Sequence, residues 1–197
     1  MENFKANNFI PPYLSAEKAL SPQLATNLIA LVEERGEQSS WAYNPYCVEL
    51  QLANPFSPTQ RKNDKKVVEV LPDLFSLGES YMRHGNKFFL NNICELITGH
   101  HGFWILKYNE GSHFALHCDW DSGPKGIRPP IVATVCFLLN DDYRGGETTL
   151  LTPTGEVMIK REKLSAMMWD GFTQHKIAPI TEGVRYALVI HYTGTIK

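Results

Sequence analysis

The sequence lacks the features that would assign the protein to a membrane or to a secretory route. It contains no run of roughly 18 or more apolar residues, the length that a membrane-spanning helix needs. Its first residues, Met1 to Asn8, include no apolar core of the kind found in a signal peptide. We therefore expect a cytoplasmic protein with no membrane partner.

Positive charge is not in excess either. The 197 residues include 19 Lys and Arg against 21 Asp and Glu, and the two signs are mixed along the chain. A nucleic-acid-binding protein usually carries a basic patch or stripe, so nucleic acid is not an expected partner. The one dense basic run is Arg61-Lys62-Asn63-Asp64-Lys65-Lys66. We interpret this run, residues 61–66, as a solvated loop, with a lid over a pocket or a contact to an acidic substrate as the alternative.

Cysteine is scarce and scattered. The four residues Cys47, Cys94, Cys118 and Cys136 show no Cys-x-x-Cys spacing. This argues against a structural zinc site and against a disulfide framework. Reduced, buried thiols are the expected state.

The length suits a single domain covering residues 1–197, because such a chain can bury one full core. A first helix is predicted from Ser21, a typical N-cap followed by proline, to a stop at Gly36. A second helix is predicted from Pro72 to about His84, with the glycine that follows as its stop. Both should pack on the outside of a sheet.

From Phe88 onward the apolar residues alternate, as they do in strands. Strands are predicted at residues 103–108, 114–120, 131–140, 148–151, 156–160, 164–169, 174–178 and 184–193. They indicate a mainly β fold with flanking helices, whose core is a jelly roll, a cupin-like double-stranded β-helix with an open mouth. We expect residues 1–100 to form a support region and residues 101–197 the jelly-roll core. His100 and His101 are expected in a surface turn.

The pair His117-x-Asp119 is the first candidate for a functional site. In an extended strand, residues two apart share one face, so both side chains can reach one ion while Cys118 points away. Two protein ligands hold a divalent ion poorly, and His175 is the best placed third ligand. Two imidazoles and one carboxylate leave open coordination positions, which is the preference of non-haem Fe(II) oxygenases. A His-x-Asp pair can also arise by chance, and a jelly roll can bind a metal without chemistry.

Arg185 is the second candidate, because it stands alone in the apolar, strand-like run of residues 184–192. A guanidinium binds carboxylates bidentately and is not neutralised by burial. An internal Arg without a nearby acid therefore suggests a carboxylate ligand that comes from outside. The alternative is a structural ion pair inside the barrel.

These candidates belong to an ordered series that spans roughly residues 103–193. The series is Tyr108-x-x-Gly111, His117-x-Asp119, Thr134 in a strand ending Leu138-Leu139-Asn140, the turn Gly145-Gly146-Glu147-Thr148, His175, Pro179, Gly183 and Arg185. In this series the chain resembles the 2-oxoglutarate- and Fe(II)-dependent dioxygenases of the prolyl 4-hydroxylase type.

The resemblance implies the cofactors and the roles of the site residues. It implies Fe(II) bound by His117, Asp119 and His175, with 2-oxoglutarate and O2 as cosubstrates and ascorbate as a candidate reductant. It also implies that Arg185 binds the distal carboxylate of 2-oxoglutarate. The hydroxyl of Tyr108 is expected near this cosubstrate, although Tyr108 could equally be a core aromatic.

Two positions depart from the pattern of this family. Leu138 stands where some relatives carry a tyrosine that helps to hold the distal carboxylate, so Thr134 on the same strand face is expected to supply the hydroxyl. His191 stands where some relatives carry a tryptophan. It either contacts the cosubstrate or a water on the iron, or is a hydrogen-bonded core histidine. Collagen-type relatives use lysine at the position of Arg185, so a collagen-modifying enzyme is not expected.

The implied reaction is hydroxylation of a C–H bond. A prolyl or other residue in a protein or peptide is the first substrate hypothesis, and a free amino acid or small-molecule metabolite is the second, because a shared fold does not specify a substrate. A non-catalytic jelly-roll binding module and a zinc hydrolase are alternatives from other classes. Neither of them accounts for Arg185.

Overall fold

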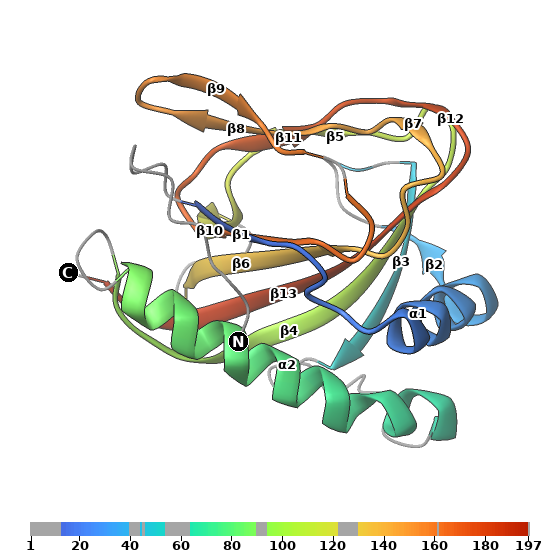
Figure 1. The fold of residues 1–197 in the computed structure, drawn as a ribbon, viewed down its shortest axis with the longest axis horizontal. Coiled ribbons are helices and arrows are strands. Elements are labelled where there is room, and N and C mark those ends of the chain that lie inside the picture. The colour runs from blue at the N-terminus through green and yellow to red at the C-terminus, as the bar shows by residue number, and fades with distance from the viewer. Residues whose placement is uncertain are drawn as a thin grey trace.

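The larger of two facing sheets carries both helices on its outer side (Figure 1). The structure, a computed structural model, describes residues 13–39, 44, 46–53, 64–89, 94–121, 130–160 and 162–196. The elements in chain order are β1 (Tyr13–Ala16), α1 (Pro22–Arg35), β2 (Glu37–Gln38), β3 (Cys47–Ala53), α2 (Lys65–Phe89), β4 (Cys94–Tyr108), β5 (Phe114–His117), the 3-10 helix η1 (Asp119–Asp121), β6 (Ile131–Leu138), β7 (Arg144–Gly145), β8 (Thr148–Thr152), β9 (Gly155–Met158), β10 (Ala166–Asp170), β11 (His175–Ile177), β12 (Ile180–Glu182) and β13 (Arg185–Ile196).

The strands pair in the double-sheet arrangement of a jelly roll. The larger sheet has the order β1-β10-β6-β13-β4-β3-β2, the smaller has the order β5-β11-β8-β9, and β12 pairs with β7. Neighbouring strands run antiparallel throughout, as in the pairing of β13 with β4 on one side and with β6 on the other. The predicted fold, mainly β with flanking helices around a jelly-roll core, is confirmed.

The alternation of side chains along β13 divides the interior into two hydrophobic clusters. Leu188 and Ile190 are fully buried in the cluster between the larger sheet and the helices, together with Leu74 of α2. Ala187 and Val189 point to the opposite face and belong to the cluster between the two sheets. Because β13 is covered on both faces, its side chains can enter the space between the sheets only at every second residue.

The first helix forms as its sequence predicts. The hydroxyl of Ser21 accepts a hydrogen bond of 3.2 Å from the backbone N–H of Leu24, and Pro22 occupies the first helical position. At the other end the N–H of Gly36 donates to the carbonyl of Val32. The predicted start and stop are both confirmed.

The second helix is longer than predicted at its N-terminus. Its first turn is capped by Asp64, whose carboxylate accepts a hydrogen bond of 3.1 Å from the backbone N–H of Lys66. Val67 is fully buried, so packing on the core holds the turn that precedes Pro72. Pro72 therefore lies inside α2, on its exposed side, and does not begin it.

The predicted stop of the same helix was also wrong, because Gly85 lies within α2. A Cβ atom at this position would come within 2.5 Å of Cε of Met168 and 2.8 Å of Cδ1 of Ile97. The glycine thus allows the helix to approach the sheet closely and does not terminate it.

The basic run at residues 61–66 was predicted to be a solvated loop, and this is wrong for Lys65 and Lys66. Both belong to the first turn of α2, and Lys66 forms an exposed ion pair with Glu34 of α1. Residues 61–63 lie outside the described part of the chain, so for them the loop, and its alternatives of a lid or a contact to an acidic substrate, stay predictions.

His100 and His101 are strand residues, and their prediction as surface turn residues was wrong. They lie in β4, which extends well beyond the predicted boundary because β13 continues as its partner and Tyr192 pairs with His100. His101 is only 5% exposed.

The described cysteine side chains agree largely with the expected state. Cys47 and Cys136 are buried free thiols, while Cys118 is partly exposed. Burial raises the pKa of Cys47 to about 12, so its thiol stays protonated at neutral pH. The side chain of Cys94 lies outside the described residues.

Neither of the two described helices is long and apolar enough to cross a membrane.

We predict that Gly171→Ala destabilises the protein. A Cβ atom at Gly171 would lie 2.0 Å from the backbone oxygen of Ile131, so the connection between β10 and β11 would have to shift. The expected loss in the free energy of unfolding is about 1–3 kcal/mol, measured by chemical denaturation. Gly99→Ala is the control, because its Cβ atom would meet only Oγ1 of Thr193, at 3.6 Å. Equal stability of the two variants would contradict this packing argument.

Candidate functional site

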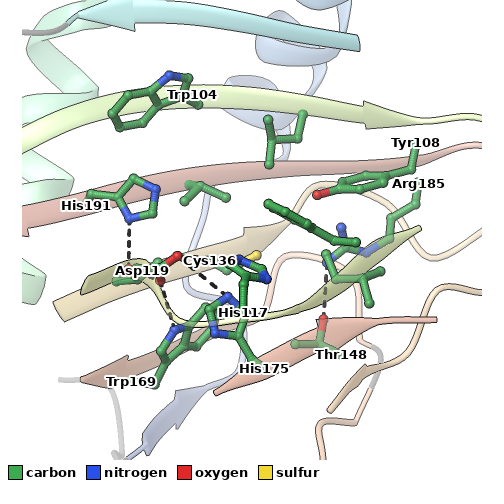
Figure 2. Close-up of a pocket in the computed structure, with 15 residues that line it drawn as sticks. Trp104, Tyr108, His117, Asp119, Cys136, Thr148, Trp169, His175, Arg185 and His191 are labelled. Carbon is green, nitrogen blue, oxygen red and sulfur yellow. Dashed lines mark hydrogen bonds and ion pairs between the residues drawn. The ribbon is translucent and has the colours of Figure 1, made fainter. Parts of the chain in front are cut away.

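A pocket opens between the two sheets, and every predicted site residue lines it. Figure 2 shows Arg185 and Thr148 at one side of it and His191 at the other, with His117 and Asp119 between them. The lining residues are Trp104, Leu106, Tyr108, Phe114, His117, Asp119, Thr134, Cys136, Thr148, Trp169, His175, Ile177, Arg185, Val189 and His191.

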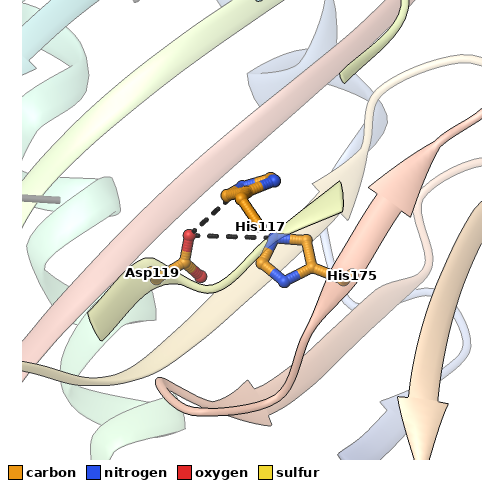
Figure 3. Close-up of side chains that lie close together, drawn as sticks. All are labelled: His117, Asp119 and His175. Atoms are coloured by element: carbon orange, nitrogen blue, oxygen red, sulfur yellow. Dashed lines mark ion pairs between the residues drawn. The ribbon is translucent and has the colours of Figure 1, made fainter. Parts of the chain in front are cut away.

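Three of these side chains form a candidate metal centre. His117 on β5 lies directly opposite His175 on β11 in the register of the smaller sheet. The Nε2 atoms of both histidines lie 3.7 Å from Oδ1 of Asp119 (Figure 3). One ligand atom from each residue lies within 4.8 Å of the other two, so the set could hold one metal ion.

The carboxylate reaches this centre by a turn and not along a strand. β5 ends at His117, and Asp119 is the first residue of η1. The backbone N–H of Trp120 donates to the carbonyl of Gly171 at 2.9 Å, which ties η1 to the connection that leads to β11. The expected strand from residue 114 to residue 120 is therefore wrong beyond His117, although the three side chains do lie together.

Backbone carbonyls orient both imidazoles. Nδ1 of His117 lies 2.7 Å from the carbonyl oxygen of Ala115, and Nδ1 of His175 lies 3.0 Å from that of Thr173. A carbonyl oxygen can only accept, so each Nδ1 carries a proton, and in a neutral imidazole with this tautomer Nε2 carries the lone pair. Both lone pairs therefore belong to the nitrogens that lie nearest to Asp119.

The electrostatics of the cluster favour the forms that bind metals. Burial, assisted by the neighbouring His175, lowers the pKa of His117 to about 4, so its imidazole is neutral at pH 7. Burial alone would raise the pKa of Asp119. The adjacent histidines, His175 and His191 foremost, outweigh it and lower that pKa to about 2. Neutral imidazoles and an ionised carboxylate are the states that metal binding requires.

Two side chains hold the other oxygen of this carboxylate. Oγ1 of Thr134 donates to Oδ2 of Asp119 at 2.6 Å, and Nε1 of Trp169 donates to the same oxygen at 3.2 Å. Thr134 was expected to supply a hydroxyl beside Arg185 in place of the tyrosine missing at Leu138. The structure shows its hydroxyl bonded to Asp119 and to His191, and its contact with the cosubstrate stays a prediction.

Arg185 occupies the other side of the pocket and is only 1% exposed. Its guanidinium carbon lies 5.0 Å from the ring centre of Tyr108, its direct neighbour on β4. Its Nη2 donates to Oγ1 of Thr148 at 3.3 Å. Nε and Nη1 of Arg185 and the hydroxyl of Tyr108 are buried without a hydrogen-bond partner. No carboxylate of the described residues forms an ion pair with this guanidinium.

Thr148, Trp104 and Trp169 are among the lining residues that sequence reasoning did not identify as functional. Thr148, the first residue of β8, is the last residue of the Gly-Gly-Glu-Thr motif that carried the family resemblance, and its position there was the available signal. Trp104 and Trp169 were assigned only to strands. Their pocket-facing positions follow from strand alternation, but nothing in the sequence indicates that Trp169 hydrogen-bonds to Asp119.

This fold and site agree with comparisons to known protein sequences. Residues 103–193 match the sequence model of the 2OG-Fe(II) oxygenase superfamily, which confirms the resemblance. A PKHD-type hydroxylase of Pseudomonas putida is 32% identical over 88 residues, a match that covers 42% of this chain. The same match spans only 39% of that relative's length.

Solved structures share the fold over most of the chain. A crystal structure of a Pseudomonas putida prolyl-4-hydroxylase has a TM-score of 0.66 at 13% identity and covers 93% of this chain and 92% of its own. A prolyl hydroxylase from Trichoplax adhaerens, in complex with a hypoxia inducible factor peptide fragment, has a TM-score of 0.70 at 18% identity. It covers 92% of this chain and 83% of its own.

We predict that His175→Ala weakens binding of a divalent ion by about 100-fold or more, because it removes one of three ligands. Isothermal titration of the metal-free protein with Co(II) measures the effect. His113→Ala is the control, since His113 is a histidine outside the cluster whose Nδ1 lies near the carbonyl of Gly111. Equal Co(II) affinity of the two variants would contradict the assignment of His175 as a ligand.

Proposed function

We propose that the protein is an Fe(II)- and 2-oxoglutarate-dependent dioxygenase that hydroxylates a C–H bond. In this proposal His117, Asp119 and His175 hold Fe(II), and Arg185 binds the distal carboxylate of 2-oxoglutarate. When bound, Fe(II) with 2-oxoglutarate and O2 supplies the oxidising chemistry. The protein supplies binding, orientation and exclusion of water.

The buried guanidinium of Arg185 carries this proposal. A charge left unpaired in a protein interior costs on the order of several kcal/mol, so an Arg with two unpartnered nitrogens has little structural purpose. A carboxylate accepts two parallel N–H bonds from a guanidinium. The unpartnered nitrogens and the hydroxyl of Tyr108 therefore fit an external carboxylate, and a metal-binding module or a zinc hydrolase would not need them.

The walls of the pocket favour a reaction that must exclude water. Leu106, Phe114 and Ile177 line it and belong to the hydrophobic cluster between the sheets. The low dielectric of such walls strengthens the contact between Arg185 and a carboxylate. The apolar walls also limit the access of bulk water to the metal side of the pocket.

We propose a prolyl or other residue within a protein or peptide as the substrate. Two findings on other proteins support this choice. The Pseudomonas putida relative is named a PKHD-type hydroxylase, and the Trichoplax adhaerens prolyl hydroxylase was solved with a peptide fragment bound. A free amino acid or a small metabolite is the competing substrate class.

A substrate screen scored by succinate release tests the reaction and the substrate class together. The Fe(II)-loaded protein is incubated with 2-oxoglutarate and O2, and with either a library of proline-containing peptides or a set of free amino acids. Succinate release that depends on a peptide is the expected result. Release that depends only on free amino acids would replace the peptide proposal. An absence of release with either set, despite bound 2-oxoglutarate, would favour a non-catalytic binding module.

We predict that Arg185→Lys raises the apparent KM for 2-oxoglutarate by about ten- to hundredfold, because lysine keeps the charge but loses the planar fork. Succinate release measures this KM, and Co(II) titration checks that metal binding is retained. Arg144→Lys is the matched control, because Arg144 is exposed and pairs with Glu182. An unchanged KM in Arg185→Lys would mean that the carboxylate binds elsewhere.

A further inference from the structure

One row of side chains crosses three neighbouring strands beneath the candidate metal centre. Trp169 on β10 is the direct partner of Thr134 on β6, and Thr134 is in turn the direct partner of His191 on β13. Direct partners in antiparallel strands project from the same face of the sheet. All three therefore point into the space between the sheets, where Asp119 lies.

The hydrogen bonds along this row have one consistent set of proton positions. Oγ1 of Thr134 lies 2.6 Å from Oδ2 of Asp119 and 2.8 Å from Nδ1 of His191. A hydroxyl has a single proton, and an ionised carboxylate can only accept. Thr134 therefore donates to Asp119 and accepts from the protonated Nδ1 of His191. Trp169, which can only donate, provides the second bond to the same carboxylate oxygen.

We propose that His191 is a positioning residue that acts through Thr134 to orient Asp119 for metal binding. This inference rests on the proposed function, because it takes Asp119 as a metal ligand. The relay from His191 and the bond from Trp169 both engage Oδ2. The carboxylate is thereby held with Oδ1, and not Oδ2, towards the Nε2 atoms of both histidines.

The far side of His191 is packed so that its ring keeps this orientation. Figure 2 shows Trp104 beside it, and the two rings meet edge to face with their centres 5.0 Å apart. The residue across from His191 on β4 is Gly102. A Cβ atom at Gly102 would lie 2.3 Å from the indole of Trp104, so only glycine leaves space for the indole at that position.

Variants of the two relay residues test the proposal through metal affinity. Thr134→Val keeps the shape of the side chain but removes the hydroxyl, and His191→Leu removes the donor. We expect both to weaken Co(II) binding, Thr134→Val by about 10- to 100-fold and His191→Leu by about 10-fold. The visible spectrum of the bound Co(II) should change as well, because the carboxylate is free to turn.

Conservative replacements and a matched control separate positioning from packing. Thr134→Ser retains the hydroxyl, and His191→Asn can place an amide nitrogen close to the position of Nδ1, so both should restore the Co(II) affinity and spectrum. Thr149→Val is the control, because Thr149 is a buried threonine on β8 that does not line the pocket. It should bind Co(II) as the unmodified protein does. Thermal unfolding without metal reports any loss of packing.

The outcomes distinguish this inference from the proposed function. If the unmodified protein binds Co(II) and Thr134→Val binds it equally well with the same spectrum, the relay is wrong and the proposed function stands. Lower thermal stability of Thr134→Val with unchanged Co(II) affinity would likewise overturn the relay. If the unmodified protein binds no Co(II), both the relay and the proposed function fail.

Discussion

The burial of one guanidinium, with no ion-pair partner among the carboxylates that the structure describes, is the constraint on which the rest of the site depends. Arg185 carries its charge into a mostly apolar pocket, where Oγ1 of Thr148 accepts a hydrogen bond from it. Burying such a charge costs considerable free energy unless an anion pairs with it. The same pocket gathers the imidazoles of His117 and His175 and the carboxylate of Asp119. Within one cavity, an external carboxylate would therefore balance the charge of Arg185, and a metal ion would balance the charge of Asp119.

The register of β13 connects the two sides of this pocket. Arg185 and His191 lie an even number of residues apart on the strand, so both face the space between the sheets. The ladder between β13 and β4 holds Tyr108 opposite Arg185, and the ladder between β13 and β6 holds Thr134 opposite His191. A slip of one residue would turn Arg185 and His191 together towards the helices. Pairing on both sides of β13 makes such a slip unfavourable.

Spacing and alternation in the sequence were sufficient to predict the jelly roll and the gathering of His117, Asp119 and His175. The prediction that the strand continues through Asp119 was wrong. The backbone N–H of Trp120 bonds to Gly171, in the distant connection after β10, and the strand ends before this point. Gly85 was taken as a helix stop, although its role depends on a methionine of β10 that packs against it. The hydrogen bonds of Thr134 to Asp119 and His191 were not predicted for the same reason. These two partners lie on η1 and β13, and their meeting with Thr134 of β6 depends on tertiary packing that local patterns do not encode.

Anaerobic titration of the Fe(II)-loaded protein with 2-oxoglutarate, followed by visible absorption, tests the central claim most directly. The measurement needs no substrate, so its outcome does not depend on the substrate class. Chelation of the metal by 2-oxoglutarate gives a faint visible band. We predict that this band appears and saturates at one equivalent of 2-oxoglutarate per protein. If no band forms while Fe(II) is bound, the pocket does not bring the metal and the carboxylate of 2-oxoglutarate together, and the account given for Arg185 is contradicted.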